Sequence, residues 1–394
     1  MPNTPRPLDE IRTRISQLDQ ELLTLLAERR RLSLDVAKNK VAVQKPIRDQ
    51  AREQALLEKL VTKAQDHQLD AHYVLSLFHT IIEDSVLIQQ RYLQNLANPD
   101  NQRPVARVSF LGNQGSYSYL AARQYFSRKQ TELVEMACDS FKKVVETVET
   151  GHADYGILPV ENTSSGSINE VYDQLQHTRL SIVGELTLPI DHCLLTVGDQ
   201  DPSQIDTLYA HPQPHQQCSE YIDTLGNVKK IYCSSTAEAM QQVADLNQPN
   251  VAAIGHAASG EFYGLTAIKG EIANQQQNHT RFIVVARKPV KVSSLTPAKT
   301  TFIMSTSQQA GSLVECLMVL RERGINMTKL ESRPVLGNPW EEMFYVDVEA
   351  NMASNLMESA LDELTTLTRY LKVLGCYPSE TISPTEVSLP DSHE

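Results

Sequence analysis

Hydrophobic residues near the start of the chain recur alternately four and three positions apart, over a run from about residue 8 to residue 41. This spacing is typical of one face of a helix that packs against other helices. The face consists of Ile11, Ile15, Leu18, Leu22, Leu25, Leu32 and Val36, with Arg29 standing among them. A guanidinium keeps its charge near neutral pH, and burying it without a partner costs several kcal/mol, so we expect an anion beside Arg29.

Two further helical runs place polar residues on faces that should turn inward. Lys40 lies within roughly 20° of Arg29 around the first helix. The other polar positions are Asp49, Arg52 and Glu53 in the run after Pro46, and Ser85 and Gln89 in the run from residue 74 to residue 92. Such a set, with few groups that titrate near neutral pH, suits a cavity that holds a small dianion in one shape. For Arg29 alone, the alternative is a coiled coil whose buried polar residue fixes the register.

The first helix would be about 50 Å long, which is more than a short helical segment needs for its own packing. We therefore expect it to pair with a second copy of the chain. Arg12 supports this expectation, because it sits roughly 100° from Arg29 around the helix and could enter a cavity more easily from the partner's chain. The pattern predicts an all-α domain over residues 1–97, built as an intertwined dimer.

Turn-forming residues from 98 to 104 mark a linker, after which the period of the pattern changes. Short hydrophobic strands then alternate with amphipathic helices, which predicts an α/β domain with a largely parallel sheet over residues 105–286. A break near Leu188 and Pro189 indicates two lobes with a cleft between them. The expected strands are 105–111, 131–137, 154–159, 180–186, 207–210, 228–232, 251–254 and 281–286.

A polar connector over residues 288 to 297 leads to a third pattern, which covers residues 298–378. Its order of elements is βαββαβ, which predicts an α+β fold of the ferredoxin-like type. The expected elements are strand 300–306, helix 311–323, strand 326–333, strand 342–350, helix 355–367 and strand 370–376.

Composition excludes several classes of protein. No hydrophobic run approaches 18 residues and the start lacks a charged-then-hydrophobic signal pattern, so we expect a cytoplasmic protein without a membrane partner. The net charge of −12, with 14 Lys and Arg against 13 Asp and Glu in residues 1–97, argues against nucleic acid. The six cysteines are scattered without metal-ligand spacing, so we expect reduced thiols and no metal site.

Three loops of the middle domain stand at the ends of strands, where ligands of such folds usually bind. They cover residues 112–118, 161–166 and 278–282. Backbone N–H groups and hydroxyls at a helix start suit a carboxylate, although each loop alone could be a plain helix cap. His211 and His279 titrate near neutral pH, but loop histidines are as readily structural or solvated, and neither is assigned a catalytic role.

The inward-facing residues of the helical segment resemble the active site of an all-helical chorismate mutase. The resemblance rests on Arg12 from the other chain and on Arg29, Lys40, Asp49, Arg52, Glu53, Ser85 and Gln89. It implies a one-step pericyclic rearrangement of chorismate to prephenate. By this resemblance Arg12, Arg29 and Arg52 hold the substrate carboxylates, and Glu53 meets the substrate hydroxyl. Lys40 and Gln89 stabilise the charge that grows on the ether oxygen, while Asp49 and Ser85 are further substrate contacts.

The middle domain resembles prephenate dehydratase through its three loops and the runs 191–193 and 211–213. The more specific match is the spacing of Tyr263, Leu265, Ile268, Asn274, Thr280, Arg281 and Phe282. The resemblance implies the two-lobed fold of periplasmic binding proteins, with Thr280 as proton donor to the leaving hydroxyl. Arg281 would hold a carboxylate or orient Thr280, and Asn113 replaces the proline that is common in the family. The candidate substrate contacts are Ser116, Asn162, Thr163, Ser164, Arg281 and Phe282.

Two motifs of the C-terminal pattern resemble the effector site of an ACT domain in phenylalanine-regulated dehydratases. They are Gly311, Ser312, Leu313 and Val314 at a helix start, and Glu331, Ser332, Arg333 and Pro334 at a strand end, with Ser312 in place of the usual Ala. The resemblance implies an allosteric phenylalanine site at a dimer interface. A plain dimerisation module is the alternative.

Together these resemblances predict a bifunctional chorismate mutase and prephenate dehydratase that is feedback-inhibited by phenylalanine and needs no cofactor. The expected partners are chorismate, prephenate, phenylalanine and further copies of the chain, as a homodimer or a larger homo-oligomer. The alternative from a different class is an amino-acid-responsive sensor without turnover, because two-lobed domains often bind ligands without converting them.

Overall fold

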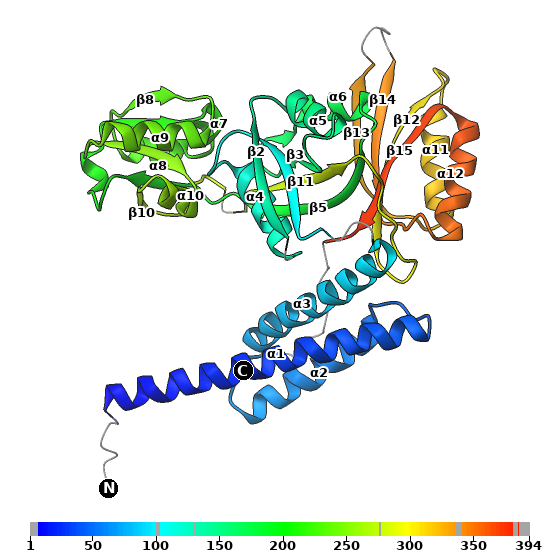
Figure 1. Cartoon of the computed structure of the whole chain (residues 1–394), viewed down its shortest axis with the longest axis horizontal. Helices are drawn as coiled ribbons and strands as arrows, with labels where there is room; N and C mark the ends of the chain where they lie inside the picture. The colour runs from blue at the N-terminus through cyan, green and yellow to red at the C-terminus, as the bar shows by residue number, and fades with distance from the viewer. Residues whose placement is uncertain are drawn as a thin grey trace. The chain divides into compact units, whose positions relative to one another are not determined.

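The computed structural model of the 394-residue chain describes residues 7–99, 103–129, 131–275, 277–335, 341–380 and 385. The chain divides into two compact units (Figure 1). The first, called the helical unit here, contains Met1–Asn101, Lys291–Pro297 and Glu380–Glu394. The second, called the α/β unit, contains Gln102–Val290 and Ala298–Ser379.

The helical unit is built from three helices, α1 (Leu8–Ala42), α2 (Gln50–Asp66) and α3 (Ala71–Ala97). The side chains of Asp49 and Asp70 cap α2 and α3 by accepting hydrogen bonds from backbone N–H groups of the first turn. The core between the helices contains Ala37, Ile47, Leu57, Ile82, Val86 and Leu93. The three expected helices are therefore confirmed.

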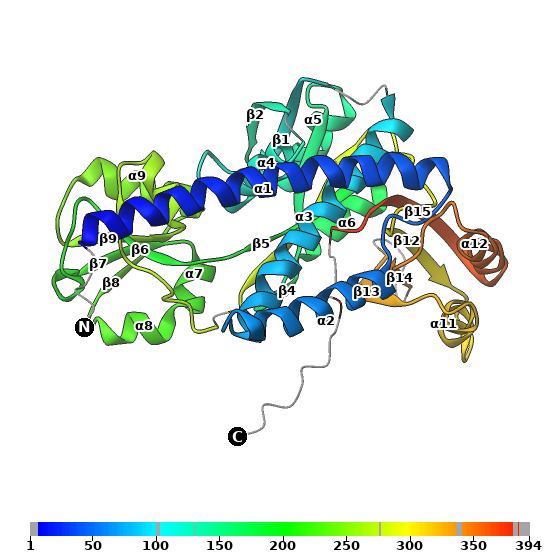
Figure 2. The same cartoon turned by 90° about the horizontal axis from the view of Figure 1, so that it is seen from below.

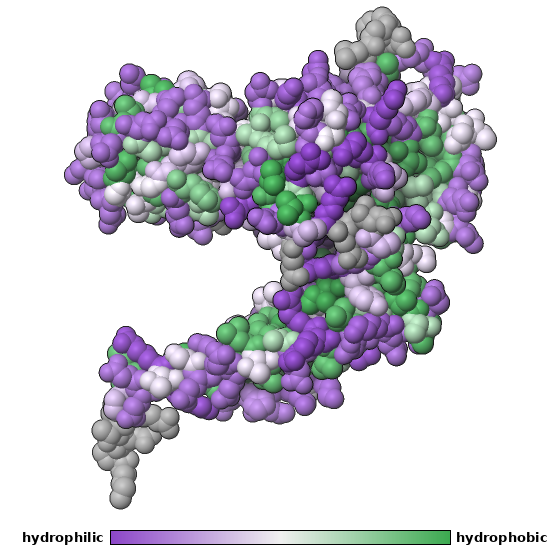
Figure 3. Space-filling view, viewed as in Figure 1, coloured by the Kyte–Doolittle hydropathy of each residue, from purple (hydrophilic) through white to green (hydrophobic). Residues whose placement is uncertain are grey.

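The buried face of α1 is not the hydrophobic seam that the spacing suggested. Ser33 and Ala37 are the buried residues of α1, whereas Leu22, Leu25 and Leu32 are 56%, 61% and 58% exposed. From Leu8 to Glu28 every side chain of α1 is exposed, and this half of the helix extends alone beyond α2 and α3 (Figure 2). Hydrophobic patches interrupt the polar surface of the helical unit (Figure 3). One copy thus leaves the seam uncovered, because α1 packs inside its own chain through a neighbouring face.

The polar connector before the third pattern belongs structurally to the helical unit. The Ile47 N–H donates to the Leu295 carbonyl oxygen at 3.0 Å, and Leu295 packs against the core of the three helices. Asn98 exchanges two hydrogen bonds of 2.8 Å with the backbone of Lys291. The segment is therefore a structural part of the unit and more than a spacer.

The first sheet of the α/β unit has the order β2-β1-β3-β11-β5, with β4 paired to β3. Its strands are β1 (Val105–Leu111), β2 (Glu132–Cys138), β3 (Tyr155–Asn162), β4 (Gly166–Ser167), β5 (Ser181–Pro189) and β11 (His279–Ala286). The helices associated with it are α4 (Tyr117–Ser127), α5 (Phe141–Glu149) and α6 (Asn169–His177). Strands β1 and β3 are buried along most of their length, which explains their nearly continuous hydrophobic sequence.

The second sheet has the order β10-β6-β9-β7-β8. Its strands are β6 (Cys193–Thr196), β7 (Thr207–Ala210), β8 (Lys229–Tyr232), β9 (Val251–Gly255) and β10 (Thr266–Lys269). The intervening helices are η2 (Pro202–Gln204), α7 (Pro212–Gln217), α8 (Ser219–Thr224), α9 (Thr236–Leu246) and α10 (Ala257–Phe262).

Both sheets are mixed, so the expectation of a largely parallel sheet is wrong. Strand β1 runs parallel to β2 and β3, but β11 runs antiparallel to β3 and β5. In the second sheet β7 is parallel to β8 and β9, while β6 is antiparallel to β9 and β10. The chain leaves the first sheet after β5 and returns to it in β11. The prediction failed because the hydrophobic pattern of a strand does not encode its direction relative to its neighbours. Strands β6 and β10 were missed, although β7 and β8, which are equally short, were predicted.

The C-terminal module consists of β12 (Ala298–Thr306), α11 (Ser312–Glu322), β13 (Met327–Pro334), β14 (Glu342–Val348), α12 (Asn355–Leu367) and β15 (Thr368–Pro378). This confirms the βαββαβ order, and the sheet order β13-β14-β12-β15 is antiparallel throughout. A core that includes Phe302, Val346, Met357 and Leu364 joins the sheet to its two helices.

The C-terminal module packs directly against the first sheet. One hydrophobic cluster contains Ile182 and Ile283 from the first sheet together with Ile303 and Leu374 from the module. A Cβ atom at Gly375 would lie 2.1 Å from the Ile182 carbonyl oxygen, so only glycine permits this approach of β15 to β5. The module and the sheet therefore share a core.

Among the described residues, no helix is both long enough and hydrophobic enough to cross a membrane.

Candidate active sites

In the helical unit, Arg29 reaches from α1 to α3. Its Nη1 atom donates to the Ser85 hydroxyl and, at 3.1 Å, to the Ile81 carbonyl oxygen. Burial lowers the pKa of Arg29, an effect that Asp84 partly offsets. Both neighbours of the guanidinium are neutral, and the half-buried cation has lost part of its hydration, so the position favours an added anion.

Lys40 lies near the acidic and basic residues at the start of α2. Its Nζ atom donates to the Ile47 carbonyl oxygen. Burial lowers the pKa of Lys40, and the charges of Asp49, Arg52 and Glu53 all act on it. The structure thus brings these four predicted residues into one neighbourhood.

Glu53 has partners that sequence reasoning missed. Arg48 forms an ion pair with its carboxylate at 3.3 Å, and both side chains are largely buried, at 16% and 12% exposure. The Thr385 hydroxyl donates to the same carboxylate at 2.6 Å. The Glu53 carboxylate is thus engaged by a cation and a hydroxyl of its own chain.

The remaining predicted residues of the helical unit differ in exposure. Gln89 is buried and donates to the Ser85 carbonyl oxygen at 3.1 Å, while its Oε1 atom has no partner among the described residues. Asp49 caps α2 through the Arg52 N–H at 3.1 Å, so its carboxylate has a local structural role. Arg12 lies 70% exposed on the uncovered half of α1, beside Asp9.

In the α/β unit, Thr280 and Asn162 face each other across β11 and β3. The two residues are register partners, and both are buried, at 7% and 5% exposure. The Asn162 Nδ2 atom donates to the Thr280 hydroxyl oxygen at 2.9 Å. Because this oxygen accepts from the amide, the hydroxyl hydrogen is left to point at another acceptor. The pair is therefore arranged to donate a proton from Thr280.

Asn162 also joins the two loops beside this pair. Its Oδ1 atom accepts hydrogen bonds from the N–H groups of Ser164 and Ser165, at 3.0 and 2.9 Å. Its Nδ2 atom contacts Asn278 Oδ1 at 2.7 Å; Asn278 belongs to the third predicted loop but was not among the candidate substrate contacts. Each atom of the carboxamide is thus committed, which fixes the orientation of Asn162.

Two candidate substrate contacts serve the local fold. The Ser116 hydroxyl caps α4 by accepting from the Tyr119 N–H at 3.2 Å, as the helix-cap alternative anticipated. The Thr163 hydroxyl accepts from the His279 N–H at 2.9 Å and donates to the Gln277 carbonyl oxygen at 3.1 Å. Ser164 remains exposed beside Asn162.

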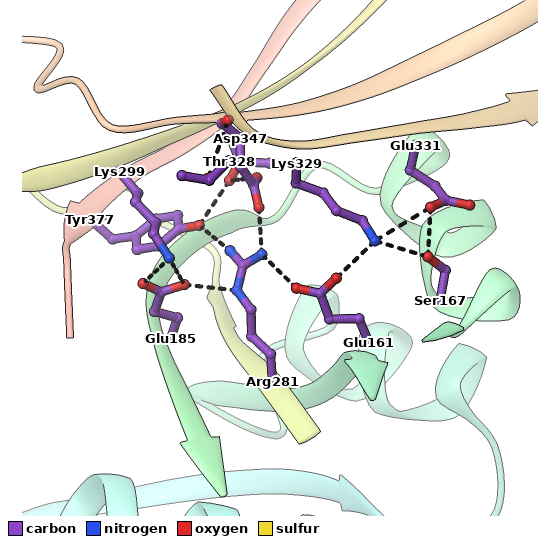
Figure 4. A network of polar contacts seen from close by, with 11 residues as sticks. Glu161, Ser167, Glu185, Arg281, Lys299, Thr328, Lys329, Glu331, Asp347 and Tyr377 are labelled. Atoms are coloured by element: carbon purple, nitrogen blue, oxygen red, sulfur yellow. Dashed lines mark hydrogen bonds and ion pairs between the residues drawn. The ribbon is translucent and has the colours of Figure 1, made fainter. Parts of the chain in front are cut away.

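Arg281 and Phe282 have surroundings other than those expected of substrate contacts. Arg281 binds Glu185 at 2.8 Å and Asp347 at 2.5 Å, in a network shown in Figure 4. Phe282 is 1% exposed and packs in a hydrophobic core with Phe110 and Tyr119. The sequence presents Thr280, Arg281 and Phe282 as one motif, but successive residues of a strand face opposite sides.

Two hydrogen bonds connect loops of the first sheet to residues of the second. Gln213 Nε2 donates to the Ser165 hydroxyl at 2.8 Å, and the Tyr263 hydroxyl donates to the Gln114 carbonyl oxygen. From the sequence, Gln213 was noted only as part of the run 211–213. A hydrogen bond between two distant segments, such as Gln213 with Ser165, leaves no pattern in a single sequence.

A buried histidine lies in the segment that connects β5 of the first sheet to β6 of the second. His192 is 1% exposed, with Nδ1 at 3.0 Å from the Tyr117 hydroxyl and Nε2 at 2.8 Å from Gln217 Oε1. Burial lowers the pKa of His192, and the Gln217 hydrogen bond and Asp191 only partly oppose this. His211, by contrast, caps α7 by accepting from the Gln213 N–H.

The two C-terminal motifs occupy the start of α11 and the edge strand β13. Gly311 adopts a φ of 90° directly before α11, and the buried Ser312 hydroxyl contacts that of Ser307 at 2.7 Å. Arg333 forms a bidentate ion pair with Asp173 of α6 at 3.0 Å. Of the remaining motif residues, Leu313 and Glu331 are half-buried, and Val314, Ser332 and Pro334 are exposed.

The cysteines are free thiols, four of them buried: Cys193, Cys218, Cys233 and Cys316. Within the described part of the chain, no group of three histidine, cysteine or acidic side chains could hold a metal ion.

Comparison with known proteins assigns both units. A family model described as chorismate mutase type II matches residues 11–90, and one described as prephenate dehydratase matches residues 108–290. A protein of Enterobacter agglomerans named bifunctional chorismate mutase/prephenate dehydratase is 57% identical over 98% of this chain and 99% of its own length. A protein of Escherichia coli strain K12 with the same name is 54% identical over 96% of this chain and 98% of its own length.

Among solved structures, a prephenate dehydratase from Arthrobacter aurescens in complex with L-Phe is 27% identical, with a TM-score of 0.63 over 72% of this chain and 93% of that chain. A prephenate dehydratase from Staphylococcus aureus is 26% identical, with a TM-score of 0.61 over 69% of this chain and 99% of that chain. The mutase and dehydratase family models match consecutive parts of this chain, and the two relatives match it over nearly its whole length. The chain therefore belongs to the family of bifunctional chorismate mutase/prephenate dehydratases.

Proposed function

We propose that the chain converts chorismate to prephenate in its helical unit and prephenate to phenylpyruvate in its α/β unit, two consecutive steps of phenylalanine biosynthesis. The observation that carries this proposal is the Asn162–Thr280 pair, in which a buried hydroxyl accepts one hydrogen bond and keeps its own proton to give. Family membership supplies the identity of the substrates.

In the mutase reaction the protein forms no covalent bond with the substrate. Arg29 and Arg52, with Arg12 from a partner chain, hold the two carboxylates of chorismate in the reactive shape. Lys40 and Gln89 donate to the ether oxygen as its bond to carbon breaks and negative charge grows on it. Glu53 binds the substrate hydroxyl, and Asp49 and Ser85 support this set. Donors fixed in advance around a growing charge contribute about 3 to 4 kcal/mol each in a site that excludes water.

In the dehydratase reaction Thr280 donates its proton to the hydroxyl that leaves prephenate as water. The electrons of the bond to the departing carboxylate enter the ring, CO2 leaves, and the ring becomes aromatic. A threonine hydroxyl is a weak acid, so the positioning by Asn162 has to supply much of the rate. Thr163 and Ser164 lie in the adjoining loop and complete the candidate substrate contacts, with Ser116 at the start of α4.

The mutase site requires a second copy of the chain. Arg12 lies on the half of α1 whose side chains are exposed in the described part of the chain, and the hydrophobic residues around it are exposed as well. A seam of this length in water is costly, and a second α1 is a matching surface. We therefore assign this face to a homodimer.

The C-terminal module is proposed to be an ACT domain that binds phenylalanine and inhibits the dehydratase. Its βαββαβ topology and the positions of the two motifs support this assignment. The A. aurescens relative was solved in complex with L-Phe. The two sheets of the middle domain are assigned to the two-lobed fold of periplasmic binding proteins. The domain boundaries proposed are 1–97, 105–286 and 298–378.

A single assay tests the function. Purified protein is given chorismate, and prephenate and phenylpyruvate are followed with and without phenylalanine. An enzyme with both activities forms phenylpyruvate, and phenylalanine slows its formation. A sensor without turnover would bind phenylalanine and leave chorismate unchanged, which would refute the proposal.

A further inference from the structure

The strand positions that carry the Asn162–Thr280 pair also carry an ion pair on the opposite face of the sheet. In the register of β3 and β11, Asn162 is opposite Thr280 and Glu161 is opposite Arg281. Arg281 Nη1 lies 3.4 Å from Glu161 Oε1. Successive strand residues face opposite sides, so each member of the reactive pair is the backbone neighbour of one member of the ion pair. A shift of the ion pair must therefore move the reactive pair.

The ladder between these strands is irregular at this point. The register shifts between Arg281 and Phe282, so that Phe282 is opposite Pro159. A bulge leaves one residue unpaired, bends the strand and redirects the side chains beside it. The pairing of β11 with β3 is interrupted next to Thr280 while its pairing with β5 continues, so the contacts that hold Arg281 add to the placement of Thr280 on the β3 side.

What holds Arg281 is largely the C-terminal module. Its guanidinium binds Asp347 of β14 at 2.5 Å and the Tyr377 hydroxyl of β15 at 3.0 Å (Figure 4). Glu185 of β5 binds it from the first sheet at 2.8 Å, and Lys299 of β12 binds Glu185 at 2.9 Å. Two strands of the module contact Arg281 directly, and a third acts through Glu185.

Glu161 is held by the same module. Lys329 of β13 binds its carboxylate at 2.8 Å and lies 3.4 Å from Glu331, which in turn accepts from the Ser167 hydroxyl at 2.6 Å. Burial alone would raise the pKa of Glu161, but Lys329 and Arg281 hold it below its ordinary value. Both members of the ion pair are therefore held in part from outside the catalytic sheet.

The centre of this cluster is enclosed. The side chains of Arg281, Glu185 and Asp347 are 12%, 3% and 8% exposed. Burial by itself would lower the pKa of Arg281, but Asp347, Tyr377 and Glu185 more than offset this and raise it. Ionic contacts in such an environment are weakly screened and constrain geometry more strongly than surface pairs do.

We propose that Arg281 is a positioning residue of the dehydratase, and that the C-terminal module sets the alignment of Thr280 with Asn162 by holding Arg281 and Glu161 through this ion cluster. The module acts on the reaction from the far side of the sheet, without a residue in the site. This inference rests on the proposed role of Thr280.

The test uses the full-length protein with the substitution Asp347→Asn. This change keeps the size of the side chain and removes one charge that holds Arg281, in a residue that touches no substrate. We expect kcat for prephenate to fall between about tenfold and a hundredfold with KM nearly unchanged, because misalignment weakens the chemical step more than binding. Phenylalanine binding, measured by calorimetry, should persist, while its effect on the remaining rate should shrink.

Tyr345→Phe is the matched control. It removes another buried hydrogen bond between the module and the catalytic domain, from the Tyr345 hydroxyl to the Tyr172 carbonyl oxygen at 2.6 Å, and leaves every charge of the ion cluster in place. This variant should keep the wild-type kcat. The mutase rate of each variant, measured on chorismate in the same sample, corrects for the amount of protein, and the persisting phenylalanine binding shows that the α/β unit is folded.

Each result decides the matter. An unchanged kcat in Asp347→Asn, or an equal loss in Tyr345→Phe, overturns the inference, since the cluster would then matter only for stability. If Asp347→Asn does not fold, Thr301→Val gives the same decision, because Thr301 donates to Asp347 at 2.6 Å. Failure of the wild-type protein to dehydrate prephenate would instead remove the proposed function on which the inference rests.

Discussion

At the scale of single residues, each candidate site contains a polar group that is partly or fully buried and hydrogen-bonded to a residue of another element. Arg29 is a half-buried cation beside the neutral Ser85 hydroxyl, and Thr280 is a buried hydroxyl oriented by the Asn162 carboxamide. In each case removal of one side chain should stop one reaction and spare the other, because the two residues belong to different units.

For Arg29→Ala we expect the mutase kcat/KM to fall roughly 10²- to 10³-fold, as is typical when a preorganised charged donor is lost. The dehydratase rate on added prephenate should stay at the wild-type level. Arg30→Ala is the control, because Arg30 pairs with Asp84 at 3.0 Å in an exposed position. An unchanged mutase rate in Arg29→Ala would remove this residue from the site.

For Thr280→Ala we expect the dehydratase kcat to fall by about 10²- to 10⁴-fold, since the proton donor is gone. Thr280→Ser keeps a hydroxyl within reach of Asn162 and should retain most of the rate. Both variants should rearrange chorismate normally, and phenylpyruvate formation is the measurement. Equal loss in the alanine and serine variants would show that the hydroxyl is not the group that matters.

The sequence predicted the positions of the candidate residues better than the directions in which their side chains point. Arg29, Lys40, Glu53 and Ser85 were selected by helical spacing, which also encodes the face on which a residue lies. For Thr280, Arg281 and Phe282 the motif gave position but not environment, so the opposite-facing Arg281 was grouped with the substrate contacts. Arg48 and the contact of Asn278 with Asn162 were missed, because contacts between segments leave no local pattern in the sequence.

At the scale of elements, α1 has two faces with different tasks. The stripe with Ser33 and Ala37 packs within the chain, and the hydrophobic seam is exposed, which is why we propose that a second copy covers it. Periodicity predicted the existence and limits of α1 closely, but a single period does not show which face of the helix packs within its own chain. The same limitation applies to the sheets, where runs of hydrophobic residues indicated strands without their directions.

Leu22→Glu tests the dimer seam. A carboxylate buried between two apolar helices is strongly unfavourable, so α1 pairing should be lost, and sedimentation should show a smaller assembly. The mutase rate should fall at least about tenfold because Arg12 no longer reaches the partner's site, while dehydration of prephenate continues. Gln20→Glu adds the same charge on roughly the opposite side of the helix and should change neither property. A normal assembly and mutase rate in Leu22→Glu would contradict the dimer.

At the scale of the whole molecule, buried histidines tie stability of the α/β unit to pH. The pKa of His192 is lowered by burial, so in the folded state it stays neutral at pH values where the unfolded chain is already protonated. Its contribution is complete above the unfolded pKa of about 6.5 and is lost as the pH falls below it. His211, His215 and His256, whose pKa values burial also lowers, act in the same direction.

We therefore expect the Tm of the α/β unit to drop as the pH is lowered from about 7.5 to about 5.5, with up to about 1.4 kcal/mol of unfolding free energy lost per pH unit for each histidine. His192→Asn should be less stable at the upper pH but show a shallower dependence. Calorimetry of both proteins across this range is the measurement, and parallel curves would exclude His192 as a source.

The packing of Leu295 against the three helices bears on how the polypeptide is made. The Ile47 N–H finds its acceptor in a residue that lies beyond the whole middle domain in the chain. On the ribosome, domains generally fold in the order in which they emerge. The three helices therefore lack the Leu295 side chain and its carbonyl acceptor until the middle domain has been synthesised. The unit that acts first on the substrate is thus the one whose core is completed later.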